Sequence, residues 1–386
     1  MTGRIVITGL GACCCLGDTA DACFDAFLEG RQGNRPLQHL HPSQYNNTIA
    51  YERAETGPHD GAFRSSGFLS RALDEAVAMA GLDPAATDCR VYVGTGLREL
   101  RSVELAALCG RRIAVADLDF TRAVRGVLPA AGPVLTLSNA CAASNYALAL
   151  AADAVALGAP MAIAAGCDTL TSSMFGLLDR VNPEPVEAIQ VFDRMRKGVL
   201  MGDGGVALVV ESEASALAAG RRPLAVLRAV GLSTDAVHET APDAPGIARA
   251  LKDAYDRAGL TPDEIDLIYV HGTGTGLNDA TEGAVLGQTF ADAGRKPALS
   301  GLKAMTGHTS GASGGIGVVA AIKSLERNAI PPTPGTTQPL DVIEGFGLSD
   351  RAFSAPVETV QVNAFGFGGV NSVVLVSRYK EPDHAL

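Results

Sequence analysis

Tryptophan is absent from this sequence, and aromatic residues make up only 5% of its 386 residues. Glycine is plentiful by contrast, with 44 residues. Few bulky rings and many small side chains favour helices that pack closely against a sheet. Charged residues are also scarce, at 19%. A chain of this length can bury one large core or two core-forming halves, and its low charge suggests that a second subunit covers part of its surface.

Long hydrophobic segments and excess positive charge are lacking as well. No apolar run reaches transmembrane length without a charge or a glycine break. The apolar stretch near the N-terminus is too short for a signal peptide and breaks at Gly9. The net charge of −11 argues against broad binding to nucleic acid or anionic membranes. We therefore predict a cytoplasmic protein with no nucleic-acid partner and no membrane partner.

The eight cysteines favour reduced thiols in an intracellular chain over a disulfide framework. Three of them are consecutive, Cys13 to Cys15. No partner ligands lie nearby at the spacing of a metal site. We interpret these three as small, half-buried residues at the end of a first strand.

Strand-like and helical stretches alternate along the chain, which predicts an α/β fold with mostly parallel strands. The predicted helices include residues 70–80, 246–258 and 315–326. The predicted strands are residues 4–9, 90–94, 134–137, 161–165, 205–210, 224–232, 267–270, 298–302, 352–354 and 371–376.

An internal repeat indicates duplication. Residues 76–96 read AVAMAGLDPAATDCRVYVGTG, and residues 254–274 read AYDRAGLTPDEIDLIYVHGTG. Both share A-G-L-x-P, a strand and G-T-G at one offset, which predicts two half-domains that meet near residue 220. His271 stands where the first copy has Val93, and a histidine at a strand end indicates chemistry.

Cys141 lies in the segment SNACAASNY, between an apolar strand and an alanine-rich helix. A thiol at a helix N-terminus faces the positive end of the helix dipole and free backbone amides, and both lower the pKa of a thiol. Its own amide can contribute to an oxyanion hole. These features suit an acyl acceptor, but a lone cysteine is commonly a buried structural residue, so this segment alone leaves both interpretations open.

Two glycine-rich loops add histidines. HGTGTGLND begins at His271, and GLKAMTGHTSGASGG carries Lys303 and His308. Such loops bring backbone close to a ligand. One cysteine and two histidines suit acyl transfer followed by carbon–carbon bond formation. The cysteine would hold the acyl group as a thioester, while two imidazole N–H groups would stabilise an enolate.

Together these motifs resemble β-ketoacyl-acyl-carrier-protein synthases of the elongating Cys-His-His type. The resemblance spans nearly the whole chain and is carried by NACAAS, FDRMRKGVLMGDGG, HGTGTGLNDATE, KAMTGH and NAFGFGGVNS. It implies a thiolase-like fold, with duplicated βαβαβαββ halves in a layered α/β/α/β/α sandwich. The half at residues 1–220 would carry the nucleophile, and the half at residues 221–386 would carry the two histidines.

The resemblance also implies roles for individual residues. Cys141 would be the nucleophile, His271 and His308 would polarise a malonyl thioester, and Lys303 would order the His308 loop. The Phe367 amide would be the second oxyanion donor. The substrate-binding residues would be Thr273, Thr275, Phe365, Phe367 and Gly368. Two alternatives remain open: Lys303 as a snorkelling surface lysine, and the two threonines as loop formers.

The implied reaction transfers an acyl group from acyl-carrier protein to Cys141. A decarboxylative Claisen condensation with malonyl-carrier protein then gives a β-ketoacyl thioester. No metal or organic cofactor is implied, because the phosphopantetheine arm belongs to the carrier substrate. The expected assembly is a homodimer or a heterodimer with a chain-length-factor-like subunit, in specialised polyketide or fatty-acid synthesis. The alternatives are a non-decarboxylating acyltransferase and a scaffold subunit. A thiolase is a weaker alternative, because a second catalytic cysteine is expected near the C-terminus and no cysteine follows Cys167.

The sequence departs from the family at Gly317, where relatives usually carry a glutamate paired with the lysine. Glu282 and Asp279 are the candidate substitutes for that carboxylate. The segment at residues 97–132 is also short, and in relatives this region builds much of the dimer interface and the floor of the acyl pocket.

Overall fold

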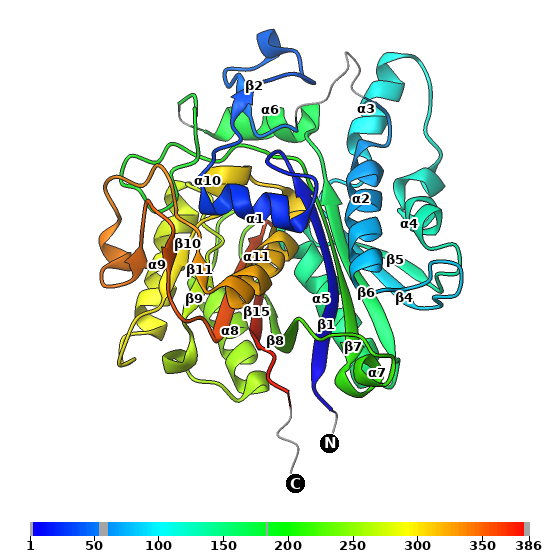
Figure 1. Ribbon diagram of the computed structural model, residues 1–386. Coiled ribbons are helices and arrows are strands. Elements are labelled where there is room, and N and C mark those ends of the chain that lie inside the picture. Colours follow the sequence, from blue (N-terminus) through cyan, green and yellow to red (C-terminus); the bar gives the residue numbers. More distant parts are fainter. Residues whose placement is uncertain (1–2, 54–60, 183, 382–386) are drawn as a thin grey trace.

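The computed structural model describes residues 3–53, 61–182 and 184–381 (Figure 1). The main strands of the first part are β1 (Ile5–Cys14), β4 (Arg90–Thr95), β5 (Val134–Ser138), β6 (Met161–Asp168) and β7 (Gly204–Ser212). Those of the second part are β8 (Ala225–Thr234), β9 (Leu267–Tyr269), β10 (Ala298–Ser300), β12 (Gly347–Leu348), β14 (Thr359–Gly366) and β15 (Val370–Arg378). They form one eleven-stranded sheet in the order β12-β10-β9-β14-β15-β8-β1-β7-β6-β4-β5.

The strand order repeats between the two parts. The first part runs β5-β4-β6-β7-β1, and the second runs β10-β9-β14-β15-β8. When the main strands of each part are numbered along the chain and the two-residue β12 is left out, both parts have the order third, second, fourth, fifth, first. The two parts join through a short antiparallel pairing of β1 with β8, with Ile5 opposite Leu227. This repeated order is what two duplicated halves of a thiolase-like fold produce.

The prediction of mostly parallel strands is wrong. Five of the ten strand pairings in the sheet are antiparallel, including β6 with β7 and β14 with β15. The parallel pairings are confined to the strands that alternate with helices. The tight turn from β14 into β15 was not anticipated, because β14 was not among the predicted strands.

Helices lie on both sides of the strands and between the halves. The helices α5 (Ala143–Ala156) and α11 (Ser313–Arg327) pack against each other, α5 on β4 and β6 and α11 on β14 and β15. On the outside, α2 (Arg64–Met79) covers β1 and β7, and α8 (Ala244–Ala258) covers β8 and β15. The result is the predicted five-layer α/β/α/β/α arrangement (Figure 1).

The remaining elements are short or peripheral. The other helices are α1 (Ala20–Leu28), α3 (Leu100–Leu108), α4 (Thr121–Val127), α6 (Ser172–Val181), α7 (Glu213–Ala218), α9 (Gly276–Thr289) and α10 (Lys303–Thr306). Two small sheets pair β2 (Arg35–Pro36) with β3 (Ile49–Ala50) and β11 (Ala329–Ile330) with β13 (Phe353–Ser354). Among the described residues, no helix is long and apolar enough to span a bilayer.

Glycine allows the helices to approach the sheet closely. A Cβ on Gly11 of β1 would lie 2.1 Å from the carbonyl oxygen of Ala72 in α2. On Gly231 of β8 it would lie 2.3 Å from the carbonyl oxygen of Ala250 in α8. Both distances are too short for any side chain, so the outer helices rest on the strand backbone.

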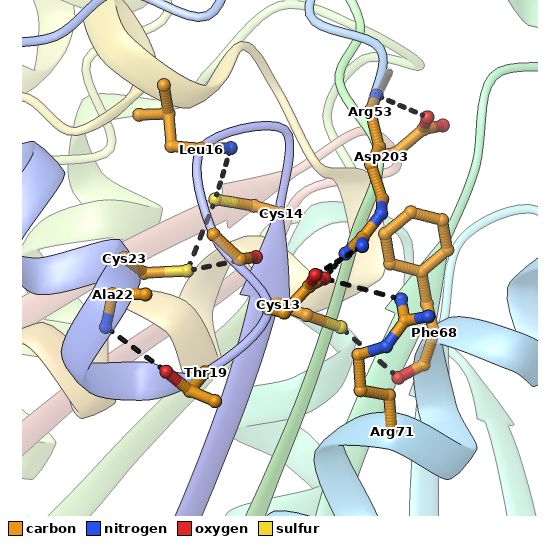
Figure 2. A network of polar contacts seen from close by, with 12 residues as sticks. Cys13, Cys14, Leu16, Thr19, Ala22, Cys23, Arg53, Phe68, Arg71 and Asp203 are labelled. Atoms are coloured by element: carbon orange, nitrogen blue, oxygen red, sulfur yellow. Dashed lines mark hydrogen bonds and ion pairs between the residues drawn. The ribbon is translucent and has the colours of Figure 1, made fainter. Parts of the chain in front are cut away.

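Cys13 and Cys14 end β1 (Figure 2), and Cys15 follows directly after the strand. Cys13, Cys14 and Cys15 are all buried rather than half-buried. The Cys13 thiol lies 3.4 Å from the carbonyl oxygen of Phe68 in α2, and the sulfur atoms of Cys14 and Cys23 are 3.5 Å apart. Burial raises the pKa of Cys13 to about 12. The described residues include no cluster of histidine, cysteine or acidic side chains able to hold a metal ion.

Candidate active site

Cys141 lies in a strained turn between β5 and α5. Ala140 adopts a left-handed conformation, with φ of 47°, which a residue with a Cβ rarely accepts. A short 3₁₀ turn over Ala140–Ala142 then leads into the helix. Cys141 as a whole residue is half-buried, and its Sγ is 2.9 Å from Nε2 of His308. The nucleophile candidate of the first half therefore contacts a histidine of the second half.

The thiol is held in its protonated form. Burial raises the pKa of Cys141 to about 11, although the charge of Lys303 and the amides of Phe367 and Cys141 act in the opposite direction. The prediction of a lowered pKa is therefore wrong for the free protein, because loss of solvation outweighs the helix terminus. The two amides at the sulfur are the pair that the sequence suggested for an oxyanion hole.

His308 follows α10 and is fixed through its backbone. Its N–H donates to the carbonyl oxygen of Leu200 at 2.8 Å, and its carbonyl oxygen accepts from the N–H of Gly202 at 3.0 Å. A Cβ on Gly202 would lie 2.1 Å from the carbonyl oxygen of Thr306. The end of the FDRMRKGVLMGDGG segment thus lies alongside the His308 loop, which explains a motif that the sequence left without a role.

The hydrogen bonds of His308 assign its tautomer. Its Nδ1 lies 3.2 Å from the backbone N of Ser310 and 3.0 Å from Oγ of Ser313. A backbone N–H can only donate, so Nδ1 is unprotonated and the proton is on Nε2, facing Cys141. Sequence reasoning missed both serines, and the only available signal was their place in the small-residue loop after the histidine.

His271 lies just beyond the end of β9 and is buried. Its ring centroid is 5.6 Å from that of His308 and 5.6 Å from that of Phe365. Its Nδ1 is 3.3 Å from Nζ of Lys303. Burial lowers the pKa of both histidines well below the usual value. Both rings are therefore neutral at physiological pH and keep one N–H each.

Lys303 is buried, so the surface-lysine alternative is wrong. Its ammonium donates to the carbonyl oxygen of His271 and approaches the Nδ1 of the same residue. Burial lowers the pKa of Lys303 to about 8, while the charges of Glu282 and Asp279 act to raise it. Within the described part of the chain, no carboxylate ion-pairs with this lysine. That it orders the His308 loop stays a prediction, because its direct contacts are to His271.

Neither candidate substitute for the missing glutamate contacts the lysine. Glu282 accepts from the N–H groups of His271 and Gly272, at 2.7 and 2.8 Å. Asp279 accepts from the N–H groups of Phe192 and Thr273, at 2.7 and 3.0 Å. Both carboxylates therefore shape loops and act on Lys303 only through their charge.

Gly317 lies on α11 beside a cavity of about 20 Å³ that Lys303, Val362 and Asn363 also line. This volume is on the scale of one water molecule. A Cβ on Gly317 would lie 2.6 Å from Cγ1 of Val362, so the valine occupies the start of the space that a longer side chain would need.

The other predicted site residues surround the same centre. Oγ1 of Thr273 is 2.9 Å from Oγ1 of Thr275, and Thr275 caps the N-terminus of α9. These contacts fit loop formation, and binding of a substrate arm stays a prediction. Phe365 is buried, Phe367 is 42% exposed, and Gly368 has φ of 83° in the turn after β14.

A thiol next to two neutral imidazoles, at the seam of two repeated α/β halves, defines a thiolase-like acyl-transfer enzyme. Comparison with protein-family models narrows this class. The model "Beta-ketoacyl synthase, N-terminal domain" matches residues 2–216, and "Beta-ketoacyl synthase, C-terminal domain" matches residues 224–337. The chain belongs to the β-ketoacyl synthase family.

Relatives match along the full length. The chain is 28% identical to 3-oxoacyl-[acyl-carrier-protein] synthase 2 of Coxiella burnetii, over 97% of this chain and 98% of that protein. It is 30% identical to Nodulation protein E of Rhizobium leguminosarum bv. trifolii, over 97% of this chain and 99% of the relative.

Solved structures are also similar to this chain over nearly its whole length. The ishigamide ketosynthase/chain length factor has a TM-score of 0.88 and 31% identity, covering 98% of this chain and all of that one. A β-ketoacyl synthase from Burkholderia phymatum STM815 has a TM-score of 0.85 and 25% identity, with the same coverage. These comparisons confirm the predicted family and fold.

Proposed function

We propose that this enzyme transfers an acyl group from acyl-carrier protein to Cys141 and condenses it with malonyl-carrier protein, releasing CO2. The observation that carries the proposal is the 2.9 Å contact of the Cys141 sulfur with Nε2 of His308, beside a second neutral histidine, His271. The product is a β-ketoacyl thioester two carbons longer than the acyl group.

The first step is transthioesterification. The Cys141 sulfur attacks the carrier thioester carbonyl, and the carrier's thiolate leaves and takes up the proton that the cysteine loses. The amides of Cys141 and Phe367 would hold the oxyanion of the tetrahedral intermediate. Because burial raises the pKa of the free thiol, the sulfur loses its proton as it attacks and is not a preformed thiolate.

The second step uses both imidazoles as neutral donors. The malonyl thioester carbonyl would accept hydrogen bonds from Nε2 of His271 and Nε2 of His308. The bond between the malonyl methylene carbon and the carboxylate then breaks, and CO2 leaves. The electron pair of that bond forms the enolate. The enolate carbon attacks the acyl thioester, the bond between the acyl carbon and the Cys141 sulfur breaks, and the released thiolate takes up a proton from solvent. Because burial lowers the pKa of both histidines, the rings donate hydrogen bonds without carrying a charge.

The two halves would supply different groups to the site. Residues 1–220 supply the nucleophile, and residues 221–386 supply the histidines and Lys303. The phosphopantetheine arm would contact Thr273, Thr275, Phe365 and Gly368. Phe367 is exposed enough to act as a gate at the mouth of the site.

The partner is a second ketosynthase-type chain, either an identical copy or a chain-length-factor-like subunit. β5 ends the sheet, and among the described residues no strand pairs with its outer edge (Figure 1). Leu135 on β5 is 48% exposed, although it belongs to an apolar strand. An open edge with apolar exposure favours pairing with another chain. One solved structure similar to this chain is described as a ketosynthase/chain length factor.

A second candidate function is acyl transfer without decarboxylation. It is favoured by one observation, the buried Lys303 that lacks a carboxylate partner within the described residues. Above pH 8 Lys303 would be neutral. It would then no longer stabilise the negative charge that decarboxylation places on the oxygen of the malonyl thioester carbonyl.

Mass spectrometry separates the two functions. Purified protein is incubated with short-chain acyl-carrier protein, with and without malonyl-carrier protein. The condensing function predicts acyl mass on Cys141, discharged by malonyl-carrier protein into the β-ketoacyl product. Loading without elongation would support the transferase, and no loading would exclude both.

Two variants complete that experiment. Cys141→Ala must abolish loading. Cys109→Ser removes an exposed thiol and must leave loading intact, because it lies outside the site.

A further inference from the structure

Asp168 is a fully buried carboxylate at the end of β6 that the proposed mechanism does not use. Its four hydrogen-bond donors come from both halves of the chain, and none of them is a cation. We propose that Asp168 is a positioning residue for His308, tying the loop of this histidine to the half that carries Cys141. This inference rests on the role proposed above for His308.

The contacts to the first half come from the end of β4. Oδ1 of Asp168 accepts from Oγ1 of Thr95 at 2.7 Å and from the N–H of Leu97 at 2.9 Å. Oδ2 accepts from the N–H of Gly96 at 2.6 Å. The carboxylate therefore accepts hydrogen bonds from the G-T-G turn of the first repeat copy. Asp279 accepts hydrogen bonds from the corresponding turn of the second copy.

The contact to the second half is to Gly311, whose N–H donates to Oδ2 of Asp168 at 2.7 Å. Gly311 follows Ser310, whose own N–H donates to Nδ1 of His308. Ser310 has φ of 48°, a left-handed conformation that a serine adopts only when its surroundings hold it. The bond from Gly311 to Asp168 supplies such a hold, one residue beyond the strained position.

Two glycines make this bridge possible. A Cβ on Gly311 would lie 2.5 Å from Cα of Thr95 and 2.7 Å from Oδ2 of Asp168. A Cβ on Gly96 would lie 2.3 Å from Oγ of Ser310. The two loops therefore touch through backbone, which leaves the carboxylate able to accept from both at once.

The state of the carboxylate fits this role. Burial raises the pKa of Asp168 to about 6, against the lowering effect of the backbone donors. At neutral pH it is ionised and offers acceptors to all four donors. Asp168 holds Gly311, and the neighbouring Ser310 N–H donates to Nδ1 of His308. This donor keeps Nδ1 unprotonated and so leaves the ring proton on Nε2.

The test is Asp168→Asn, which keeps the shape but replaces one acceptor oxygen with an NH2 group that faces N–H donors. In ¹⁵N-histidine-labelled wild-type protein, the ring of His308 should show a single tautomer with the proton on Nε2. His308 is identified by the signal that His308→Ala removes. The variant should show a mixture of tautomers. Its kcat for decarboxylating malonyl-carrier protein should fall about 10- to 100-fold, with KM changed much less.

Asp179→Asn is the matched control. Asp179 is also a buried acidic residue, and it accepts from the backbone N–H groups of Asn46 and Asn47, at 2.9 and 2.6 Å, outside the His308 loop. It should lose stability without changing the His308 tautomer. The proposal is overturned if Asp168→Asn keeps both the single tautomer and the wild-type kcat, or if both variants shift the tautomer alike.

The wild-type spectrum keeps the proposal testable if Asp168→Asn does not fold. A His308 ring protonated on Nδ1 in the wild type would overturn it directly. Gly311→Ala gives a second variant, since its methyl group displaces the N–H from Asp168, and an unchanged tautomer would also overturn the proposal. If the wild type neither loads nor elongates acyl chains but the tautomer shifts as expected, the proposed function fails and the positioning role stands.

Discussion

Cys141, the proposed nucleophile, is protonated in the free protein. Its sulfur has two amides and a neutral imidazole around it, yet burial keeps its pKa near 11. A free enzyme with a protonated thiol is protected from oxidants and alkylating agents, which react with thiolates. The surroundings that stabilise the charge are in place before the charge exists.

Alkylation of Cys141 by iodoacetamide should therefore be slow at pH 7 and accelerate about tenfold per pH unit up to about pH 10. Lys303→Met should slow it further, because the lysine charge lowers the pKa of this thiol. Peptide mass spectrometry after quenching measures both, with the exposed Cys109 as reference in the same digest. Alkylation of Cys141 at pH 7 as fast as that of Cys109 would contradict the prediction.

Lys303 should leave a signature in stability against pH. Its pKa is lowered to about 8 from 10.5, so between these values the unfolded chain binds more protons than the folded one. Stability contributed through this group then rises with pH across that window, and below pH 8 the folded protein carries the full cost of a buried ammonium.

Urea unfolding of wild type and Lys303→Met at pH 7 to 10 measures this effect. The free energy of unfolding of the wild type should improve relative to the variant as pH rises above 8. A difference that stays constant across the range would show that the lysine has an ordinary pKa in the fold.

At the scale of elements, Gly317 of α11 faces Val362 of β14 at the position where the resemblance implies a glutamate. Gly317→Glu alone should destabilise by about 1–3 kcal/mol, because its Cβ meets Val362 at 2.6 Å. Combined with Val362→Ala, the new carboxylate has room beside Lys303 and should raise the pKa of the lysine. The pH–rate profile of decarboxylation checks this: its alkaline limb should move to higher pH in the double variant and stay in place in Val362→Ala alone.

The close contact of α2 with β1 is equally testable. Gly11→Ala should destabilise by about 1–3 kcal/mol or more, since its methyl group would meet the carbonyl oxygen of Ala72. Gly67 lies on α2, and no atom lies within 4 Å of a Cβ built on it. Gly67→Ala should therefore raise the free energy of unfolding by about 0.5–1 kcal/mol through helix propensity. Denaturant unfolding of the pair measures the difference, and equal effects would refute the packing argument.

At the scale of the molecule, the open edge of β5 predicts the assembly. Leu135→Lys should shift a dimer to monomer in native mass spectrometry, because it places a charge on the exposed face of the edge strand. Leu217→Lys, at an equally exposed leucine on α7, should leave the dimer intact. A dimer that survives Leu135→Lys would place the interface elsewhere.

The sequence predicted the parts of the site that are local. Cys141, His271 and His308 each stand in a short motif with its own turn chemistry, so they could be named as candidates without tertiary information, and the structure brings them together. β14 could have been found from the alternating residues 359–362, but its pairing could not.

Asp168 could not be assigned a role from sequence, because its partners lie 71 to 143 residues away along the chain. An acidic residue ending an apolar strand was the only available signal. The raised pKa of Cys141 was missed for a similar reason: burial depends on every layer around the thiol, whereas a helix terminus can be recognised locally.

The two edges of the sheet differ in the length of strand that they offer to another chain. Beyond β10 the chain adds the two-residue strand β12, whereas beyond β5 the described residues add nothing. A molecule with one long open edge can pair with one neighbour through that edge and then has none left to offer. If β5 forms the proposed interface, assembly would therefore stop at a closed pair instead of running on into a fibre.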